Sequence, residues 1–214
     1  MTSAYDKNYL EKARATLGRM LDFAVYDLKL DIEEFFDRFI VSGIANAFEN
    51  GDSKTIAGKS GVELAYEVLE KTGEDARNIK PRFTANRSEE YWTGWALAYY
   101  QWKTSLSFAE IVKYIPIEQI KALYSPYHEM DIRHFVDKMN ELYRDAKPET
   151  NLKIYRKRAG LSQKQLAELA DIPVRMIQHY EQRQKNINKA QTEYLVKLSK
   201  VLNCDIEDLL ELAE

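Results

Sequence analysis

The chain has 214 residues, of which 45% are hydrophobic and 30% charged, and its formal net charge is −3. This length allows two domains with cores of their own, and the composition is typical of a soluble globular protein. No uncharged run approaches the roughly 18 to 20 residues that a membrane span needs, and the N-terminus has no signal-peptide pattern, so we expect a cytoplasmic protein that does not bind membranes. The single cysteine, Cys204, excludes an internal disulfide and a cysteine-based zinc site, and we expect it to be inert packing.

Residues 1–147 are predicted to form a helical domain, because apolar residues recur at helical spacing and no alternating strand pattern competes. The predicted helices cover 6–28, 31–49, 61–71, 88–104, 107–114, 116–124 and 131–145.

The polar segment 51–61 is expected to be an exposed loop, or a loop that recognises a protein partner. Its Gly-Lys-Ser does not match a phosphate-binding loop, because Gly51 and Gly58 enclose six residues where that motif has four, and a helix precedes it.

The predicted helix 88–104 carries all three tryptophans of the chain. Trp92, Trp95, Tyr99 and Trp102 follow one another at intervals of three, four and three residues, which places them on one stripe. Large aromatic side chains dominate burial in small domains, so a core position is one interpretation. The alternative is a binding surface for a partner or ligand, where tryptophan and tyrosine are enriched.

A second polar cluster contains His128, Glu129, Asp131 and His134. The two histidines are six residues apart across an expected turn at 125–127, whereas metal ligands on one helix are three or four apart, so we expect no metal site and a half-buried His134. The remaining sequence shows no catalytic constellation. We therefore expect neither an enzyme nor a cofactor.

The boundary between two domains is expected near residues 146–150. Pro148 is predicted to end the preceding helix and Thr150 to cap the next, which gives a second domain at 148–214.

The charge of this second domain differs from that of the first part of the chain. Residues 151–200 contain 11 Lys and Arg against 4 Asp and Glu, a balance of +7, whereas residues 1–150 contain 20 against 25, a balance of −5. A basic segment of this kind favours binding to the phosphates of nucleic acid. The candidates for phosphate contact are Lys153, Arg156, Lys157, Arg158, Lys164, Arg183, Lys185 and Lys189.

Residues 161–185 are predicted to be two short helices joined by a tight turn. Ser162 begins the first helix with a capping box to Gln165, and the apolar face of that helix is expected to consist of Leu166, Ala167, Leu169 and Ala170. Asp171 tolerates the left-handed conformation of a tight turn, and Pro173 suits the start of a helix. The second helix is predicted to turn Met176, Ile177 and Tyr180 inward, which leaves Val174, Arg175, Gln178 and His179 near its exposed end.

Residues 151–210 resemble the helix-turn-helix domain of the Xre/Cro family of bacterial and phage repressors. The family pattern is seen in Leu161-Ser162-Gln163, Leu166-Ala167, Ile172, Ile177 and Glu181, followed by the late helices with Leu195, Leu198, Leu202 and Leu210. The resemblance implies a five-helix, lambda-repressor-like DNA-binding domain behind the N-terminal helices, and hence an all-α chain. It also implies an ion pair between Arg156 and Glu181.

The same resemblance places DNA contacts on individual residues. It assigns a backbone contact to Gln163 and base contacts to the start of the second helix. With the basic residues that follow, the predicted DNA-binding set is Gln163, Val174, Arg175, Gln178, His179, Arg183 and Lys185. The usual turn glycine is replaced by Asp171, the polar helix cap by Pro173, and a later Asn-Gly by Gln182-Arg183, so base preference does not transfer. Arg175 is the best candidate for a guanine contact and Val174 for a thymine methyl group.

Domains of this type usually bind palindromic double-stranded DNA as dimers, with half-sites about 34 to 36 Å apart. We therefore expect a homodimer, and the acidic residues after position 204 are expected to face away from DNA.

The first 150 residues also resemble, less specifically, bacterial regulators encoded beside small toxin-like proteins, through Tyr91 to Trp102 and Ser125 to Asp131. That resemblance implies a repressor that is also an antitoxin. The alternative is a repressor that responds to a small molecule bound among Trp92, Trp95 and Tyr99.

Overall fold

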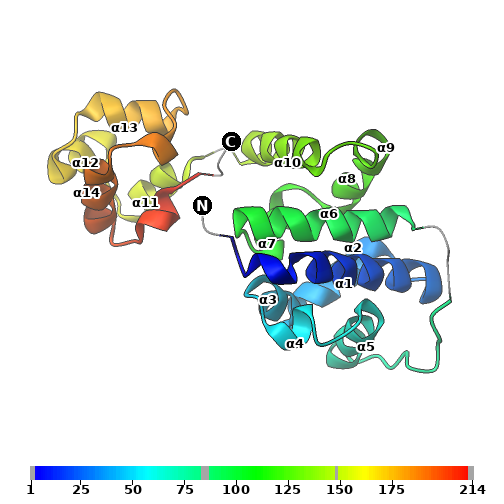
Figure 1. The fold of residues 1–214 in the computed structure, drawn as a ribbon. Helices are drawn as coiled ribbons and strands as arrows, with labels where there is room; N and C mark the ends of the chain where they lie inside the picture. The colour runs from blue at the N-terminus through cyan, green and yellow to red at the C-terminus, as the bar shows by residue number, and fades with distance from the viewer. Residues whose placement is uncertain (1–2, 83–86, 148, 212–214) are drawn as a thin grey trace. The chain divides into compact units, whose positions relative to one another are not determined.

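The computed structural model describes residues 3–82, 87–147 and 149–211, and within these ranges the chain forms helices and loops with no β-strand. The predicted all-α class is therefore confirmed. The chain divides into two compact units, residues 1–146 and 147–214 (Figure 1). None of the described helices combines the length and the apolar character that crossing a membrane requires.

The first unit, residues 1–146, consists of helices of unequal length. They are α1 Leu10–Asp22, α2 Ile32–Val41, α3 Ile44–Glu49, α4 Ser53–Ile56, α5 Gly61–Lys71, α6 Glu89–Thr104, α7 Phe108–Tyr114, α8 Ile117–Ala122, α9 Tyr124–Tyr127 and α10 Ile132–Ala146. A 3₁₀ turn at Lys7–Tyr9 precedes α1 and a π-helical segment at Phe23–Asp27 follows it.

Several predicted boundaries differ from the observed ones because local turns and helix caps interrupt the apolar pattern. The expected helix 31–49 is divided into α2 and α3 at Gly43, whose φ of 77° is in the left-handed region. The segment 51–61 is not an open loop throughout: Asp52 caps α4, which buries Thr55 and Ile56. The expected turn at 125–127 lies inside α9.

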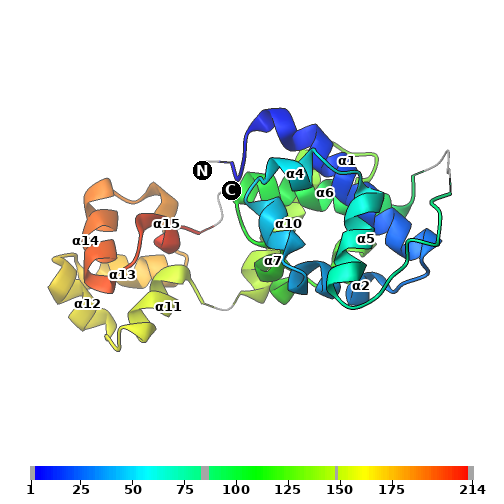
Figure 2. The same cartoon turned by 90° about the horizontal axis from the view of Figure 1, so that it is seen from below.

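Helices α1 and α6 form the central pair of this unit and lie side by side (Figures 1 and 2). They are antiparallel, because the Ser88 hydroxyl before α6 donates to Asp22 at the end of α1, and the Trp102 indole at the other end donates to the carbonyl oxygen of Tyr5. Glycine permits their close approach: a Cβ added at Gly94 would lie 2.6 Å from the Leu17 carbonyl oxygen. This pair fixes which residues of α6 face the core.

The core beside this pair is rich in phenylalanine. Phe36, Phe39, Phe48 and Phe108 come from α2, α3 and α7 and are almost fully buried. Their rings meet at centroid distances of 5.5 to 6.3 Å, and the contacts are edge-on or tilted. Such contacts add to the free energy gained by burying their apolar area.

The second unit, described over residues 147 and 149–211, contains five α-helices, as predicted (Figure 2). They are α11 Asn151–Arg158, α12 Gln163–Ala170, α13 Val174–Glu181, α14 Thr192–Leu202 and α15 Ile206–Leu209, with a 3₁₀ turn at Ile187–Lys189. Thr150 caps α11 by accepting from the Lys153 amide, whereas the expected role of Pro148 lies outside the described residues.

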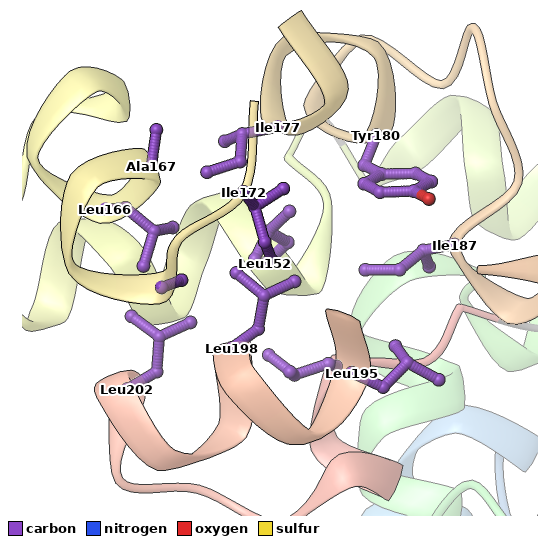
Figure 3. Packing of buried hydrophobic residues seen from close by; sticks show 12 residues of the cluster. Leu152, Leu166, Ala167, Ile172, Ile177, Tyr180, Ile187, Leu195, Leu198 and Leu202 are labelled. Carbon is purple, nitrogen blue, oxygen red and sulfur yellow. The ribbon is translucent and has the colours of Figure 1, made fainter. Parts of the chain in front are cut away.

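The core of this unit lies between α12, α13 and α14. Figure 3 shows Leu166, Ile172, Ile177 and Leu198 pointing toward one another, and each is at most 4% exposed. The side chain of Cys204 packs against the same cluster, and burial raises the pKa of its thiol. This core holds α12 and α13 in a fixed orientation.

Candidate nucleic-acid interface

The turn between α12 and α13 is built by local hydrogen bonds. Ser162 and Gln165 form a capping box at the start of α12. Asp171 ends that helix with a φ of 50°, in the left-handed region that aspartate tolerates better than most residues. Ile172 is then 4% exposed, and its side chain anchors the turn in the core. Pro173 occupies the N-cap of α13, so the second helix begins at Val174.

Helix α13 has one buried side and one exposed end. Ile177 and Tyr180 are 0% and 5% exposed, and Met176 packs against the cluster at its edge. In the first turn, Val174 is 39% exposed and Arg175 is exposed as well. An aliphatic group and a guanidinium at an exposed helix start can contact a thymine methyl group and a guanine edge, respectively.

The other two predicted base-contacting residues are less accessible. Gln178 and His179 are half-buried in the second turn of α13, and Nδ1 of His179 is buried without a hydrogen-bond partner among the described residues. Arg175 and Val174 therefore have the greatest freedom to contact bases.

An ion pair ties α13 to α11. Arg156 Nε and Nη2 donate to the two carboxylate oxygens of Glu181 at 2.6 and 2.9 Å, and Nη1 donates to the Leu161 carbonyl oxygen at 2.7 Å. These bonds to Glu181 raise the pKa of Arg156. Arg156 and Glu181 are 9% and 8% exposed, so this is a buried bidentate pair.

Gln163 joins the same network from α12. Its Nε2 donates to Glu181 at 2.7 Å, so one amide proton is engaged inside the domain. The side-chain amide has a second proton, which can donate to a phosphate oxygen. The network thus fixes the position of a residue at the start of α12.

The residues after α13 form a basic loop. Arg183 has a φ of 55°, and its Nη2 donates to the Lys147 carbonyl oxygen at 3.0 Å. Lys185 lies next to α13, with Nζ 3.6 Å from the sulfur of Met176. Both side chains are exposed.

Ion pairing divides the basic residues of this unit into two groups. Lys153 and Lys157 both bind Glu149, whose pKa they lower, with Lys157 making the larger contribution. The guanidinium of Arg156 is buried, so its expected contact with phosphate is wrong, and Lys164 lies 4.0 Å from Glu168. Within the described part of the chain, no ion pair is found for Arg175, Arg183, Lys185 and Lys189.

The exposure of two further side chains, one in each unit, differs from the sequence prediction. Leu169 is 62% exposed rather than part of the buried apolar face of α12. His134 is exposed rather than half-buried.

The polar cluster at 128–134 is explained by local bonds. His128 stacks on Tyr124 at a centroid distance of 4.2 Å, and Asp131 accepts from the amide and the guanidinium of Arg133. Across residues 3–82, 87–147 and 149–211, no three His, Cys, Asp or Glu residues gather as metal ligands.

The acidic residues after position 204 take part in bonds within the second unit. Glu211 accepts from the Asn151 amide at the start of α11, while Glu214 lies outside the described residues.

The aromatic stripe of α6 is divided between core and surface. Trp92 is 9% exposed and contacts Tyr124 and Phe135 edge-on, so it belongs to the core. Trp95, Tyr99 and Trp102 are half-buried on another part of the helix surface, where Tyr91 joins them. The sequence pattern placed Trp92 on the stripe because it lies only about 60° from Trp95 around the helix.

Arg14 was not among the functional residues predicted from the sequence; it is 6% exposed on α1 and lies over the ring of Trp95. A signal was present: Arg14 interrupts the apolar series Leu10, Leu17 and Leu21, which predicts that its side chain shares their covered face.

The second unit is similar to a known protein family. The family model described as Helix-turn-helix matches residues 152–209, the segment that contains α11 to α15. This segment is an Xre-type helix-turn-helix domain, a type found in DNA-binding transcription regulators. No curated protein and no solved structure matched the chain.

Proposed function

We propose that this chain is a sequence-specific transcriptional repressor of the cytoplasm that inserts the first turn of α13 into the major groove of its operator. The observation that carries the proposal is the asymmetry of that helix: Ile177 and Tyr180 hold it in the core, while Val174 and Arg175 are exposed at its start. An α-helix presented in this way fits the major groove, where each base pair has a distinct pattern of donors and acceptors.

The predicted contacts fall into two classes. Val174, Arg175, Gln178 and His179 are proposed to face bases, with Arg175 donating to the O6 and N7 atoms of a guanine. Phosphate contacts are proposed for Gln163, Arg183 and Lys185. The second class positions the domain on the duplex and adds affinity that does not depend on base sequence.

We further propose that the chain binds as a homodimer to a palindrome with half-sites about 34 to 36 Å apart. Sedimentation of the purified chain with and without operator DNA measures the stoichiometry. One chain per operator at saturation contradicts this proposal.

Operator selection from random duplexes, followed by binding assays on variants, tests the assignment of contacts. Arg175→Ala is expected to weaken operator binding by about 1 to 3 kcal/mol and to relax base preference at one position of each half-site. Lys185→Ala is expected to weaken operator and random DNA alike and to reduce the salt dependence. Lys157→Ala removes the same charge, but its partner Glu149 already offsets it, so a smaller change is expected.

Equal losses for Arg175→Ala on operator and random DNA contradict the assignment of base contacts. Full affinity of both variants contradicts the placement of α13 on DNA.

The N-terminal unit is proposed to bind a partner protein, which makes the chain a candidate antitoxin for a toxin-like protein. The observation in favour is the partly exposed aromatic surface of α6. Co-expression with the product of the neighbouring gene should give a stable complex, and separate elution of the two proteins contradicts this role. A small molecule enclosed by Trp92, Trp95 and Tyr99 is less favoured, because Trp92 is buried against Tyr124 and Phe135.

A further inference from the structure

Arg14 on α1 is a buried cation whose hydrogen bonds are incomplete. The residue is 6% exposed, and Nη1 donates to Glu11 Oε1 at 2.6 Å. Its Nε and Nη2 atoms are buried, and no hydrogen-bond partner for them is found among the described residues. Buried N–H groups of a charged side chain are normally paired, because leaving them unpaired costs free energy.

The unpaired atoms form the edge of the guanidinium that binds carboxylates. In Arg156 the same two atoms, Nε and Nη2, hold the two oxygens of Glu181. This two-bond geometry is specific for planar, bidentate anions. Arg14 therefore has the donor arrangement of Arg156 without the carboxylate.

Aromatic rings lie against the guanidinium of Arg14. The Cζ atom of Arg14 lies 3.3 Å from the centroid of the Trp95 ring and 5.0 Å from that of Tyr99. Stacking on the rings keeps the guanidinium in place, and burial lowers the pKa of Arg14. A bound carboxylate would reverse that effect by favouring the charged form.

The rings belong to a longer surface, which we call the aromatic strip: Tyr91, Trp95, Tyr99 and Trp102. These residues are separated by four, four and three positions and are all half-buried. From Tyr91 to Trp102 there are eleven helical rises of about 1.5 Å, so the strip extends over about 16 Å. A second guanidinium, that of Arg87, lies 4.5 Å from the ring of Tyr91, so positive charge is present along the strip as well as beside Trp95.

We infer that the aromatic strip and Arg14 form a docking site for an acidic segment of a partner protein. An Asp or Glu carboxylate of that segment accepts from Nε and Nη2 of Arg14, and its apolar neighbours pack on Trp95 and Tyr99. A protein segment fits better than a small molecule, because the strip runs along about three turns of one helix. The inference rests on the proposed role of the N-terminal unit in partner binding and is independent of DNA binding.

Access to the unpaired edge requires a movement of the Arg14 side chain. Nη1 already bonds to Glu11, whose side chain is 74% exposed, so the Nη1 end of the guanidinium lies close to the surface. Rotation of the Arg14 side chain toward Glu11 presents the edge to an incoming carboxylate. Glu11 is then a competitor, because it offers Arg14 a carboxylate of its own.

The test begins with selection of 12-residue peptides from a random library on the full chain. The selected peptides are expected to contain a shared Asp or Glu, and its replacement by Asn or Gln is expected to weaken binding about tenfold or more. In the Arg14→Gln variant this loss of affinity should disappear, because the carboxylate of the peptide and the guanidinium of Arg14 act as a pair. The Glu11→Gln variant should bind the acidic peptide several-fold more tightly.

Two controls separate this inference from the proposed function. Arg175→Ala should keep the peptide affinity while operator binding falls, and Arg14→Gln should keep operator binding. Because Arg14→Gln can also disturb folding, the Nε–H resonance of Arg14 in the unsubstituted chain is measured by NMR. The peptide is expected to shift this resonance downfield as a hydrogen bond forms.

The inference is overturned if no peptide is selected or if the selected peptides lack a shared acidic residue. It is also overturned if replacing the acidic residue of the peptide by its amide weakens binding to the Arg14→Gln variant as much as it weakens binding to the unsubstituted chain. An unchanged Arg14 Nε–H resonance at saturating peptide overturns it as well. A loss of operator binding by Arg175→Ala in the same experiments supports the proposed function separately.

Discussion

Replacing Glu181 by alanine should destabilise the DNA-binding unit more than a surface substitution does. Arg156, which is 9% exposed in the unsubstituted chain, would lose two charge-assisted hydrogen bonds, and Gln163 would lose the acceptor of its amide. Only the bond from Arg156 Nη1 to the Leu161 carbonyl oxygen would persist. An uncompensated buried charge of this kind costs about 3 to 5 kcal/mol.

The distribution of tryptophan allows the two units to be followed separately. Trp92, Trp95 and Trp102 all belong to the first unit, so tryptophan fluorescence reports its unfolding alone. Far-UV circular dichroism reports both units, because both are helical. In urea, Glu181→Ala is expected to shift a transition seen by circular dichroism and to leave the tryptophan transition in place.

A double variant, Arg156→Met with Glu181→Leu, is the matched control. Replacing both partners by apolar groups of similar size removes the buried charges together, so a stability close to that of the unsubstituted chain is expected. A loss below about 1 kcal/mol for Glu181→Ala refutes this reasoning, since the central estimate is several times larger. A double variant as unstable as the single one also refutes it.

Two further predictions concern the first unit. Gly94→Ala is expected to destabilise it by about 1 to 3 kcal/mol, because the new Cβ would lie 2.6 Å from the Leu17 carbonyl oxygen; urea unfolding followed by tryptophan fluorescence measures the loss, and an unchanged midpoint contradicts the close packing. Hydrogen bonds from Arg133 lower the pKa of Asp131 from 3.8 to about 2 in the folded protein. The stabilisation of the folded state by these bonds is therefore complete at pH values above the pKa of 3.8 expected in the unfolded chain, and it is lost as the pH falls through about 2. NMR titration should show this pKa, and Arg133→Ala should raise it; equal values in both chains contradict the assigned bonds.

The turn of the DNA-binding unit could be predicted from the sequence because local chemistry determines it. Ser162 and Gln165 form the capping box, and Asp171 adopts the left-handed conformation, as their residue types indicate. Ile172 and Ile177 are buried at the positions that the apolar spacing indicates. Each of these features depends on residues a few positions apart.

Features that depend on distant neighbours could not be predicted. The exposure of Leu169 and the burial of Trp92 depend on which helices cover α12 and α6. Arg14 shares this property: the spacing of its apolar neighbours places it on a covered face, but its unpaired edge becomes evident only when the partners available to it are known.

Chemical footprinting of the operator complex with dimethyl sulfate tests the central claim most directly. The reagent methylates guanine N7 in the major groove and adenine N3 in the minor groove, so it reports which groove α13 occupies. We predict protection of guanine N7 in both half-sites, lost at one guanine per half-site in the Arg175→Ala variant. Protection confined to adenine N3, or guanine protection that Arg175→Ala leaves intact, contradicts the account.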